Sequence, residues 1–160
     1  MPLLIEVLAD LPVMAIVATA GRVRLSGLPS NVVARAFVRG AEVARRARLV
    51  ISNGGSTTGY QALSQGTPVL GLPSNFDQYL ASEVIVRAGA GQSVKARRAS
   101  PEALRTSITD LLENEQTRAA ARRVAASFEA LDCASAFGAF VGRAVGQQRI
   151  AANERIAAND

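Results

Sequence analysis

Apolar residues along this chain follow two alternating patterns. Short, continuously apolar runs are typical of strands that are covered on both faces of a sheet, and apolar residues spaced three or four apart are typical of helices. Such runs predict strands at residues 13–19, 49–52 and 68–72 and, less uniformly, at residues 32–38, and residues 91–95 are expected to form a short last strand. The spaced patterns predict helices at residues 2–11, 41–46, 56–65, 77–88, 101–112, 121–131 and 137–145.

The alternation of strands and helices predicts the fold class. Parallel strands need crossover connections, which helices usually supply. We therefore expect an α/β fold, a Rossmann-like doubly wound parallel sheet with helices on both faces. Residues 1–146 are expected to form one domain that includes the C-terminal helices. Residues 147–160 contain a tandem Arg-Ile-Ala-Ala-Asn repeat with no core-forming pattern, and we expect this tail to fray.

Composition narrows the class of protein. The chain has 160 residues, of which 49% are hydrophobic and 19% charged, as in one globular domain. No apolar run approaches the ~18 residues of a membrane span, and the start at Pro2 lacks the features of a signal peptide. We expect a cytoplasmic protein with no membrane span. Cys133 is the single cysteine, so no internal disulfide is possible.

Charge and residue types limit the chemistry. The formal net charge is +5, which suits an anionic partner, but the arginines are scattered over predicted helix faces. Aromatic residues make up only 4% of the chain, which leaves little to stack on bases, so we expect no nucleic-acid binding. The sequence has no histidine, which removes serine–histidine and cysteine–histidine pairs and most zinc sites. No metal or other cofactor is expected, because no aspartate cluster accompanies the phosphate site described next.

A small-residue turn follows the predicted strand at residues 49–52. Gly54 and Gly55 permit a tight turn and the close approach of a ligand. Ser56, Thr57 and Thr58 then place three hydroxyls at the N-terminus of a helix, where free backbone N–H groups and the helix dipole favour a phosphate. A turn in which these residues merely cap the helix is the alternative for this segment taken alone.

The spacing downstream of the turn is more specific. The chain reads Asn-Gly-Gly-x-x-Thr-x-x-Gln-Ala-Leu from Asn53, then Gly-x-Pro-Val-x-x-x-Pro from Gly66, then Asp-Gln at residues 77–78. Over residues 13–112 this pattern resembles the donor-binding, C-terminal half of GT-B glycosyltransferases, which use nucleoside diphosphate sugars and include plant and bacterial natural-product enzymes. The resemblance implies a Rossmann-like domain with a nucleotide-sugar donor as its ligand.

The resemblance also implies a role for each residue of the motif. The turn Asn53, Gly54, Gly55, Ser56, Thr57 and Thr58 would hold the donor diphosphate. Gln61 would face the ribose, and Asp77 with Gln78 would bind the sugar hydroxyls. A carboxylate beside an amide offers acceptors and donors at neighbouring points, which suits vicinal hydroxyls. A helix cap followed by a solvated polar residue is the alternative for Asp77 and Gln78.

The chain departs from the family pattern at several positions. Asn53 stands in place of a usual histidine, and Gln61 in place of a usual glutamate. Arg39-Gly40 replaces a Pro-Gln pair that contacts the base, and Ala81 replaces an asparagine. Neutral side chains at the first two positions make weaker contacts than charged ones, so we expect modest donor affinity. The base is left open, and a uridine diphosphate sugar is the expected donor.

By the same resemblance, a complete enzyme needs more than this chain. The acceptor site and catalytic base belong to an N-terminal domain, so no catalytic residue is expected here. The family's donor domain also starts with a central strand, whereas Met1 falls after it. Its absence would leave two neighbouring strands with unpaired backbone groups and an open slot. We favour a fragment of a longer enzyme over a separate subunit that pairs with an acceptor-domain partner, and expect no sugar transfer by the chain alone.

Two other classes of function stay open. One is a non-catalytic nucleotide-binding or scaffold module that keeps the fold without activity. The evidence for it is the pair of neutral residues, Asn53 and Gln61, and the missing half. A dinucleotide-binding Rossmann domain ranks lower, because no Gly-x-Gly-x-x-Gly follows a predicted strand.

Overall fold

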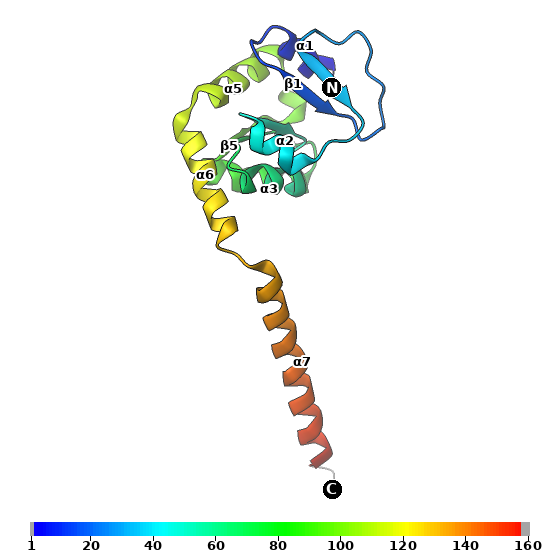
Figure 1. The fold of residues 1–160 in the computed structure, drawn as a ribbon, viewed down its shortest axis with the longest axis vertical. Helices are drawn as coiled ribbons and strands as arrows, with labels where there is room; N and C mark the ends of the chain where they lie inside the picture. Colours follow the sequence, from blue (N-terminus) through cyan, green and yellow to red (C-terminus); the bar gives the residue numbers. More distant parts are fainter. Residues whose placement is uncertain (1, 158–160) are drawn as a thin grey trace. The chain divides into compact units, whose positions relative to one another are not determined.

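A computed structural model describes the backbone of residues 2–157 and the side-chain surroundings of residues 2–146. The chain divides into two compact units, residues 1–126 and residues 127–160. The first unit contains all five described strands and most of the helices (Figure 1). It therefore carries every residue of the predicted donor site.

Strands and helices alternate through the first unit, as the hydrophobic pattern predicts. The strands are β1 (Ala15–Ala18), β2 (Val32–Arg35), β3 (Val50–Ser52), β4 (Val69–Gly71) and β5 (Gly91–Ser93). The helices are α1 (Pro2–Ala9), α2 (Gly40–Arg46), α3 (Ser56–Ser64), α4 (Phe76–Arg87), the 3-10 turn η1 (Ala96–Arg98), α5 (Pro101–Glu113) and α6 (Glu115–Glu129), which crosses the unit boundary. The predicted α/β, Rossmann-like fold class is confirmed.

The strands form two parallel sheets rather than one. β1 pairs with β2, with Ala15 opposite Val32, and β3–β4–β5 form the second sheet, with Val50 opposite Val69. In Figure 1 the first pair, in blue, lies above the three-stranded sheet, in green. Among the described strands, no hydrogen-bonded pair joins one sheet to the other.

One hydrophobic core nevertheless serves both sheets. Its buried members come from α1, β2, β4 and α5, and they are Val7, Leu8, Val32, Leu70, Leu104, Ile108 and Leu111. Side chains of β1 and β3, including Val17 and Ile51, pack against this cluster. Figure 1 shows α1 and α5 close together over this core. Burial of this apolar set, at roughly 25 cal/mol per Å² removed from water, is the main source of stability.

Helix ends follow the predicted capping signals at most positions. The Oγ atom of Ser100 accepts from the N–H of Ala103 at 3.1 Å, with Pro101 at the first helical position. Gly66 and Gly89 have φ values of 70° and 67°, the left-handed conformation expected after a helix. α6 starts earlier than predicted, at Glu115, because the Oδ1 atom of Asn114 caps the helix by accepting from the Thr117 N–H.

The second unit contains the end of α6 and the helix α7 (Cys133–Ala157). α7 starts four residues before the predicted helix at residue 137, because Asp132 accepts from the N–H of Ser135 at 3.0 Å and caps it. The predicted fraying tail, residues 147–160, lies outside the residues whose side chains are described, so it stays a prediction, as does the domain boundary at residue 146. Within the described residues no single helix is long and apolar enough to cross a membrane. The bent pair Glu115–Glu129 and Cys133–Gly146 has, taken together, the length and composition that a membrane span needs.

Candidate functional site

The turn after β3 is held by its own polar groups. The Oδ1 atom of Asn53 accepts from the Gly55 N–H at 3.1 Å, and the Gly54 N–H donates to the Oγ atom of Ser52 at 3.1 Å. Gly54 has a φ of 80°, which a residue with a side chain adopts only with strain. These contacts fold the chain sharply from β3 into α3. The side-chain carbonyl oxygen of Asn53 thus stabilises the turn, and its amide NH₂ group can donate to another partner.

The N-terminus of α3 is open to an external acceptor. Gly55 caps the helix without a side-chain hydrogen bond, and the first bond that returns into the chain is from the Gly59 N–H to the Gly55 carbonyl, at 3.2 Å. The N–H groups of Ser56, Thr57 and Thr58 precede it, where a helix has no internal acceptors. Thr57 and Thr58 are exposed. Three N–H groups, two exposed hydroxyls and the positive end of a helix dipole form a site suited to phosphate oxygens.

The predicted sugar-binding pair, Asp77 and Gln78, lies in the first turn of α4. The Oδ1 atom of Asn75 caps the helix by accepting from the Gln78 N–H at 3.0 Å. The Gln78 side chain in turn accepts, through Oε1, from the N–H of Ser74 at 2.9 Å and from its hydroxyl at 3.0 Å. Gln78 is therefore fixed in place by its acceptor atom, while its NH₂ group remains available to donate. The predicted alternative, a helix cap followed by a solvated polar residue, does not describe this pair, because Asn75 is the cap and the Gln78 side chain is hydrogen-bonded to Ser74.

Asp77 has no such local role. Its side chain is exposed, and within residues 2–146 it forms no hydrogen bond or ion pair. It follows Asn75 by two residues, in the first turn of α4, where a carboxylate also interacts favourably with the helix dipole. Its carboxylate is thus free to accept hydrogen bonds from a ligand.

The two segments meet in the fold. A Cβ atom on Gly54 would lie 3.2 Å from the backbone carbonyl oxygen of Gln78 and 3.4 Å from the Cβ atom of Pro73, and it would also overlap the hydroxyl oxygen of Ser82. The turn after β3 therefore packs directly against the start of α4. The structure brings together the predicted diphosphate-binding turn and the predicted sugar-binding pair.

The Gln61 side chain lies beside a different segment, the start of α2. Its side chain is exposed, and its Oε1 atom occupies the position that a Cβ atom on Gly40 would take. Gly40 is the first residue of α2, preceded by Arg39, whose guanidinium is paired with Glu42 at 2.9 Å. The predicted ribose contact thus adjoins Arg39-Gly40, the pair that stands where the family usually contacts the base.

A comparison with family models decides the class. The model for the "Erythromycin biosynthesis protein CIII-like, C-terminal domain" matches residues 3–135, most of the chain. The chain belongs to this family. The predicted resemblance is confirmed: this is a C-terminal, donor-binding type of domain of the GT-B glycosyltransferases.

Individual relatives agree with this assignment. A "PGL/p-HBAD biosynthesis glycosyltransferase" of Mycobacterium tuberculosis is 44% identical over 124 residues, which are 78% of this chain and 29% of that protein. A "PGL/p-HBAD biosynthesis rhamnosyltransferase" of Mycobacterium bovis is 38% identical over 79% of this chain and 28% of that protein. The solved structure "Spinosyn Rhamnosyltransferase SpnG complexed with thymidine diphosphate" is 29% identical, with a TM-score of 0.71 over 81% of this chain and 36% of that chain. The chain thus spans less than a third of the length of the two mycobacterial relatives.

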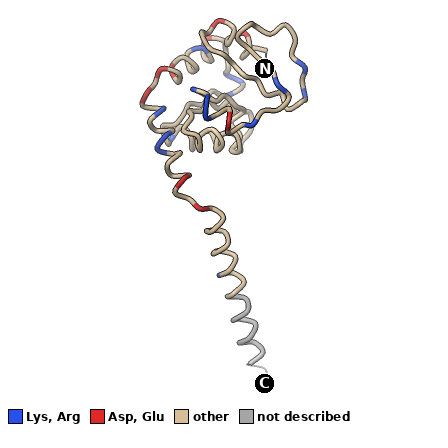
Figure 2. Tube along the Cα trace, viewed as in Figure 1, with Lys and Arg blue, Asp and Glu red and all other residues tan. Residues whose placement is uncertain are grey.

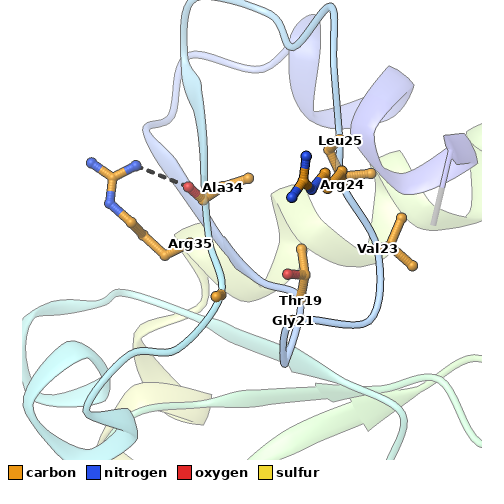
Figure 3. Close-up of a pocket in the computed structure, with 8 residues that line it drawn as sticks. Thr19, Gly21, Val23, Arg24, Leu25, Ala34 and Arg35 are labelled. Atoms are coloured by element: carbon orange, nitrogen blue, oxygen red, sulfur yellow. Dashed lines mark hydrogen bonds between the residues drawn. The ribbon is translucent and has the colours of Figure 1, made fainter.

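Two cavities in the glycosyltransferase domain contain none of the predicted site residues. The larger, of about 430 Å³, lies at the ends of β1 and β2 and is lined by Thr19, Gly21, Val23, Arg24, Leu25, Ala34, Arg35 and Ala36 (Figure 3). In Figure 3 the guanidinium of Arg35 points away from that of Arg24 and donates to the carbonyl oxygen of Ala34 at 2.9 Å. The two cations therefore do not converge on one ligand. Sequence patterns did not indicate this cavity, since a long loop forms one of its walls.

The second cavity, of about 360 Å³, lies between α4 and β5. It is lined by Tyr79, Glu83, Val86, Gln92, Ser93 and Lys95. The ammonium of Lys95 lies 5.3 Å from the centre of the Tyr79 ring, and Glu83 is paired with Arg87 at 3.0 Å.

Among residues 2–146 no three His, Cys, Asp or Glu side chains are grouped closely enough to hold a metal ion. Figure 2 shows Lys and Arg spread over many elements of the first unit.

Proposed function

We propose that this chain is the donor-binding half of a glycosyltransferase that moves a hexose from a nucleoside diphosphate sugar to an acceptor. The observation that carries the proposal is the packing of the turn at Gly54, which leads into the open α3 N-terminus at Ser56–Thr58, against the start of α4, where Asp77 is exposed. One end of this site suits a diphosphate and the other suits sugar hydroxyls. A nucleotide sugar joins these two groups by one covalent bond, so it fits a site with both ends.

The chemistry assigned to this half is electrostatic. Glycosyl transfer breaks the bond between the anomeric carbon and the diphosphate, through a transition state with positive charge on the sugar ring. Negative charge then grows on the leaving β-phosphate oxygen. Fixed N–H groups and hydroxyls at Ser56, Thr57 and Thr58 stabilise that charge without reorganisation, which is how preorganised dipoles lower a barrier. The site needs no positive side chain for this role.

The remaining parts of the reaction are assigned to polypeptide outside this chain. The domain spans 29% of its mycobacterial relative, and no described residue of the site is placed to act as a base for an acceptor. We therefore assign the acceptor site and the catalytic base to an N-terminal acceptor domain, carried by a longer form of the chain or by a partner subunit. The isolated chain is expected to bind donor and to transfer no sugar.

Calorimetric titration tests the donor site. Thr58→Ala should weaken diphosphate binding by about tenfold or more, because a hydrogen bond to a charged group contributes roughly 1.5–3 kcal/mol. Thr106→Ala, an exposed threonine on α5, is the matched control and should bind as the unaltered chain does. Titrations with uridine and with thymidine diphosphate test the predicted uridine preference, for which the thymidine diphosphate bound to SpnG provides the competing base.

The sugar end is tested separately. Asp77→Asn should weaken binding of the nucleotide sugar and leave binding of the free nucleoside diphosphate unchanged. Asp110→Asn, an exposed aspartate on α5, should change neither. Binding of none of the nucleotides would contradict the proposal and support the scaffold alternative, whereas binding of NAD would support the dinucleotide-binding alternative.

A further inference from the structure

The outward face of α4 carries an apolar stripe that the described elements leave open. Phe76, Leu80 and Val84 are spaced four residues apart, so they lie on one face of the helix. Their exposed fractions are 76%, 53% and 62%. The opposite face, with Ser82 and Ile85, is buried against the strand ends and α3. A contiguous apolar patch rimmed by polar residues marks an interaction site for a protein or a membrane.

A basic turn follows β5. The chain leaves the strand through Lys95 and enters η1, which carries Arg97 and Arg98. All three residues are exposed, and within residues 2–146 none of them forms an ion pair. The basic turn, residues 95–98, therefore presents three positive charges without a carboxylate partner.

Two contacts hold the basic turn against the start of α4. The N–H of Ala96 donates to the carbonyl oxygen of Pro73 at 3.0 Å, just before α4 begins. The ammonium of Lys95 lies 5.3 Å from the centre of the Tyr79 ring. Tyr79 neighbours Phe76 on the helix surface, on the side where α4 and β5 line a common cavity. The positive charges and the apolar stripe therefore form one continuous surface.

Nearby carboxylates do not cancel the charge of this surface. Glu83 lines the same cavity as Tyr79, but it is paired with Arg87 at 3.0 Å, so the two charges compensate each other. Asp77 follows Phe76 directly, which places it about 100° around the helix, on the flank away from Tyr79. The side of the stripe that faces β5 thus keeps a net positive charge.

We propose that the apolar stripe of α4 and the basic turn together dock this chain on an anionic lipid surface. The apolar side chains of an interfacial helix enter the boundary between headgroups and acyl chains, and Lys or Arg beside them attract anionic headgroups. The stripe supplies the first contact and the basic turn supplies the second. With 12 residues, α4 is too short to cross a bilayer, so it lies along the surface.

The charge of the basic turn selects this occupant. An uncharged apolar partner would cover the stripe but would leave three cations without compensation. An anionic lipid surface offers an apolar interior and negative headgroups side by side, as the stripe and the basic turn are arranged. The attraction between exposed charges also weakens as salt is added, which is a property that can be measured.

Vesicle co-sedimentation tests the charges. The whole chain should bind vesicles of equal parts phosphatidylglycerol and phosphatidylcholine much more tightly than vesicles of phosphatidylcholine alone. Arg97→Gln/Arg98→Gln should weaken binding to the anionic vesicles about fivefold for each charge removed. Arg45→Gln/Arg46→Gln, which changes two adjacent exposed arginines on α2, is the matched control. It removes the same charge and should change binding far less.

Two further sets of variants test the stripe. Leu80→Glu/Val84→Glu should weaken binding about tenfold or more, because burial of two apolar side chains is lost. Thr106→Glu/Gln116→Glu adds the same charge at exposed positions of α5 and α6 and should leave most of the binding. The chain has no tryptophan, so Leu80→Trp introduces a single reporter. Its emission should shift to shorter wavelength with anionic vesicles, and that of Thr106→Trp should not. Thermal denaturation checks that each variant is folded.

Other outcomes overturn the inference. Absence of binding to the anionic vesicles would do so directly. Unchanged binding by Leu80→Glu/Val84→Glu would place the contact elsewhere, such as on the exposed apolar side chains of α7. Equal losses in the two arginine pairs would show attraction by net charge alone. A dimer that forms without lipid and is dissociated by Leu80→Glu/Val84→Glu would assign the stripe to a second copy. Equally tight binding of polyglutamate would assign the basic turn to an acidic protein.

Discussion

The hydroxyl oxygen of Ser82 occupies the space in which a side chain on Gly54 would begin. The same oxygen would lie 2.5 Å from a Cβ atom on Gly71, so one α4 side chain closes on glycines after β3 and at the end of β4. Ser82 is 2% exposed. Small residues at both positions let α4 approach the strand ends closely. This approach helps to set the distance between the α3 N-terminus and the start of α4, and therefore the spacing of the two ends of the proposed donor site.

Gly54→Ala is expected to lower the free energy of unfolding and to weaken donor binding. The added methyl group meets the Ser82 oxygen, and the φ of 80° adds backbone strain of about 1–3 kcal/mol. Chemical denaturation gives the stability change, and calorimetry with a nucleoside diphosphate gives the binding change.

Gly27 supplies the matched control for this substitution. Its φ is 64°, but a Cβ atom there would meet nothing within 4 Å. Gly27→Ala should therefore lower the free energy of unfolding through backbone strain alone, without a steric clash, and it should leave donor binding unchanged. Equal losses in the two variants would show that the contact with Ser82 has no effect. In the double variant Gly54→Ala/Ser82→Ala, part of the loss should be recovered, as expected for residues in contact.

Ser82 also provides a test of its own. Its Oγ atom is buried and has no hydrogen-bond partner among the described residues. Burying an unpaired hydroxyl costs about 1–3 kcal/mol, so Ser82→Ala should leave stability unchanged or raise it. Thr67, also buried, donates from Oγ1 to the Ala44 carbonyl at 2.7 Å, so Thr67→Val should lower stability by about 1 kcal/mol. A clear loss of stability in Ser82→Ala would contradict this account. Thermal denaturation of both variants checks the pair.

The sequence predicted the elements of the fold because each one carries a local signal. Apolar runs marked the first four strands, the second of them less uniformly, and Ser100, Gly66 and Gly89 marked helix ends that the structure confirms. The turn at Gly54 was likewise visible as a glycine pair between a strand and a helix. These signals work at short range, where propensity and capping act.

Contacts between distant elements carried no such signal. Nothing in the sequence indicates that Ser82 would contact Gly54, or that Gln61 would lie over Gly40, because both pairs depend on how helices dock. The hydrogen bonds from Ser74 to the Gln78 side chain were not predicted either. The long loop between β1 and β2, which forms a wall of the larger cavity, has no periodic pattern to interpret.

Asn31 is a further residue that the sequence did not single out. Its Nδ2 atom donates to the carbonyl oxygens of Leu8, Leu11 and Val13, at 2.8, 3.2 and 3.0 Å, and so ties the end of α1 to the start of β1. Asn31→Asp replaces the donor with a carboxylate that faces these carbonyls. We expect a loss of about 2 kcal/mol or more in the free energy of unfolding.

The control for Asn31 is Asn75. This residue caps α4 as an acceptor, from the Gln78 N–H, and aspartate caps helices equally well. Asn75→Asp should leave stability nearly unchanged in the same denaturation experiment. A small effect of Asn31→Asp, comparable with that of Asn75→Asp, would contradict the donor role.

Asp132 gives the chain a pH-dependent helix start. Hydrogen bonds from the hydroxyl and the N–H of Ser135 lower the pKa of the Asp132 carboxyl below its ordinary value. A lowered folded-state pKa means that the cap is fully formed above the ordinary pKa and is lost as pH falls through the lowered one. NMR titration should show this lowered pKa, and Ser135→Ala should raise it toward the ordinary value. An unchanged titration in Ser135→Ala would contradict the assignment.

Gly40→Ala is expected to separate the nucleoside end of the proposed donor site from its diphosphate end. The new methyl group takes the position of the Gln61 Oε1 atom, so the Gln61 side chain must move, at little cost because its end is flexible and exposed. If Gln61 contacts the ribose, affinity for a nucleoside diphosphate should fall about as far as in Gln61→Ala. Affinity for inorganic pyrophosphate should not change, and the double variant should lose no more than either single one. Equal losses for pyrophosphate and for the nucleotide would instead place the effect at the α3 N-terminus.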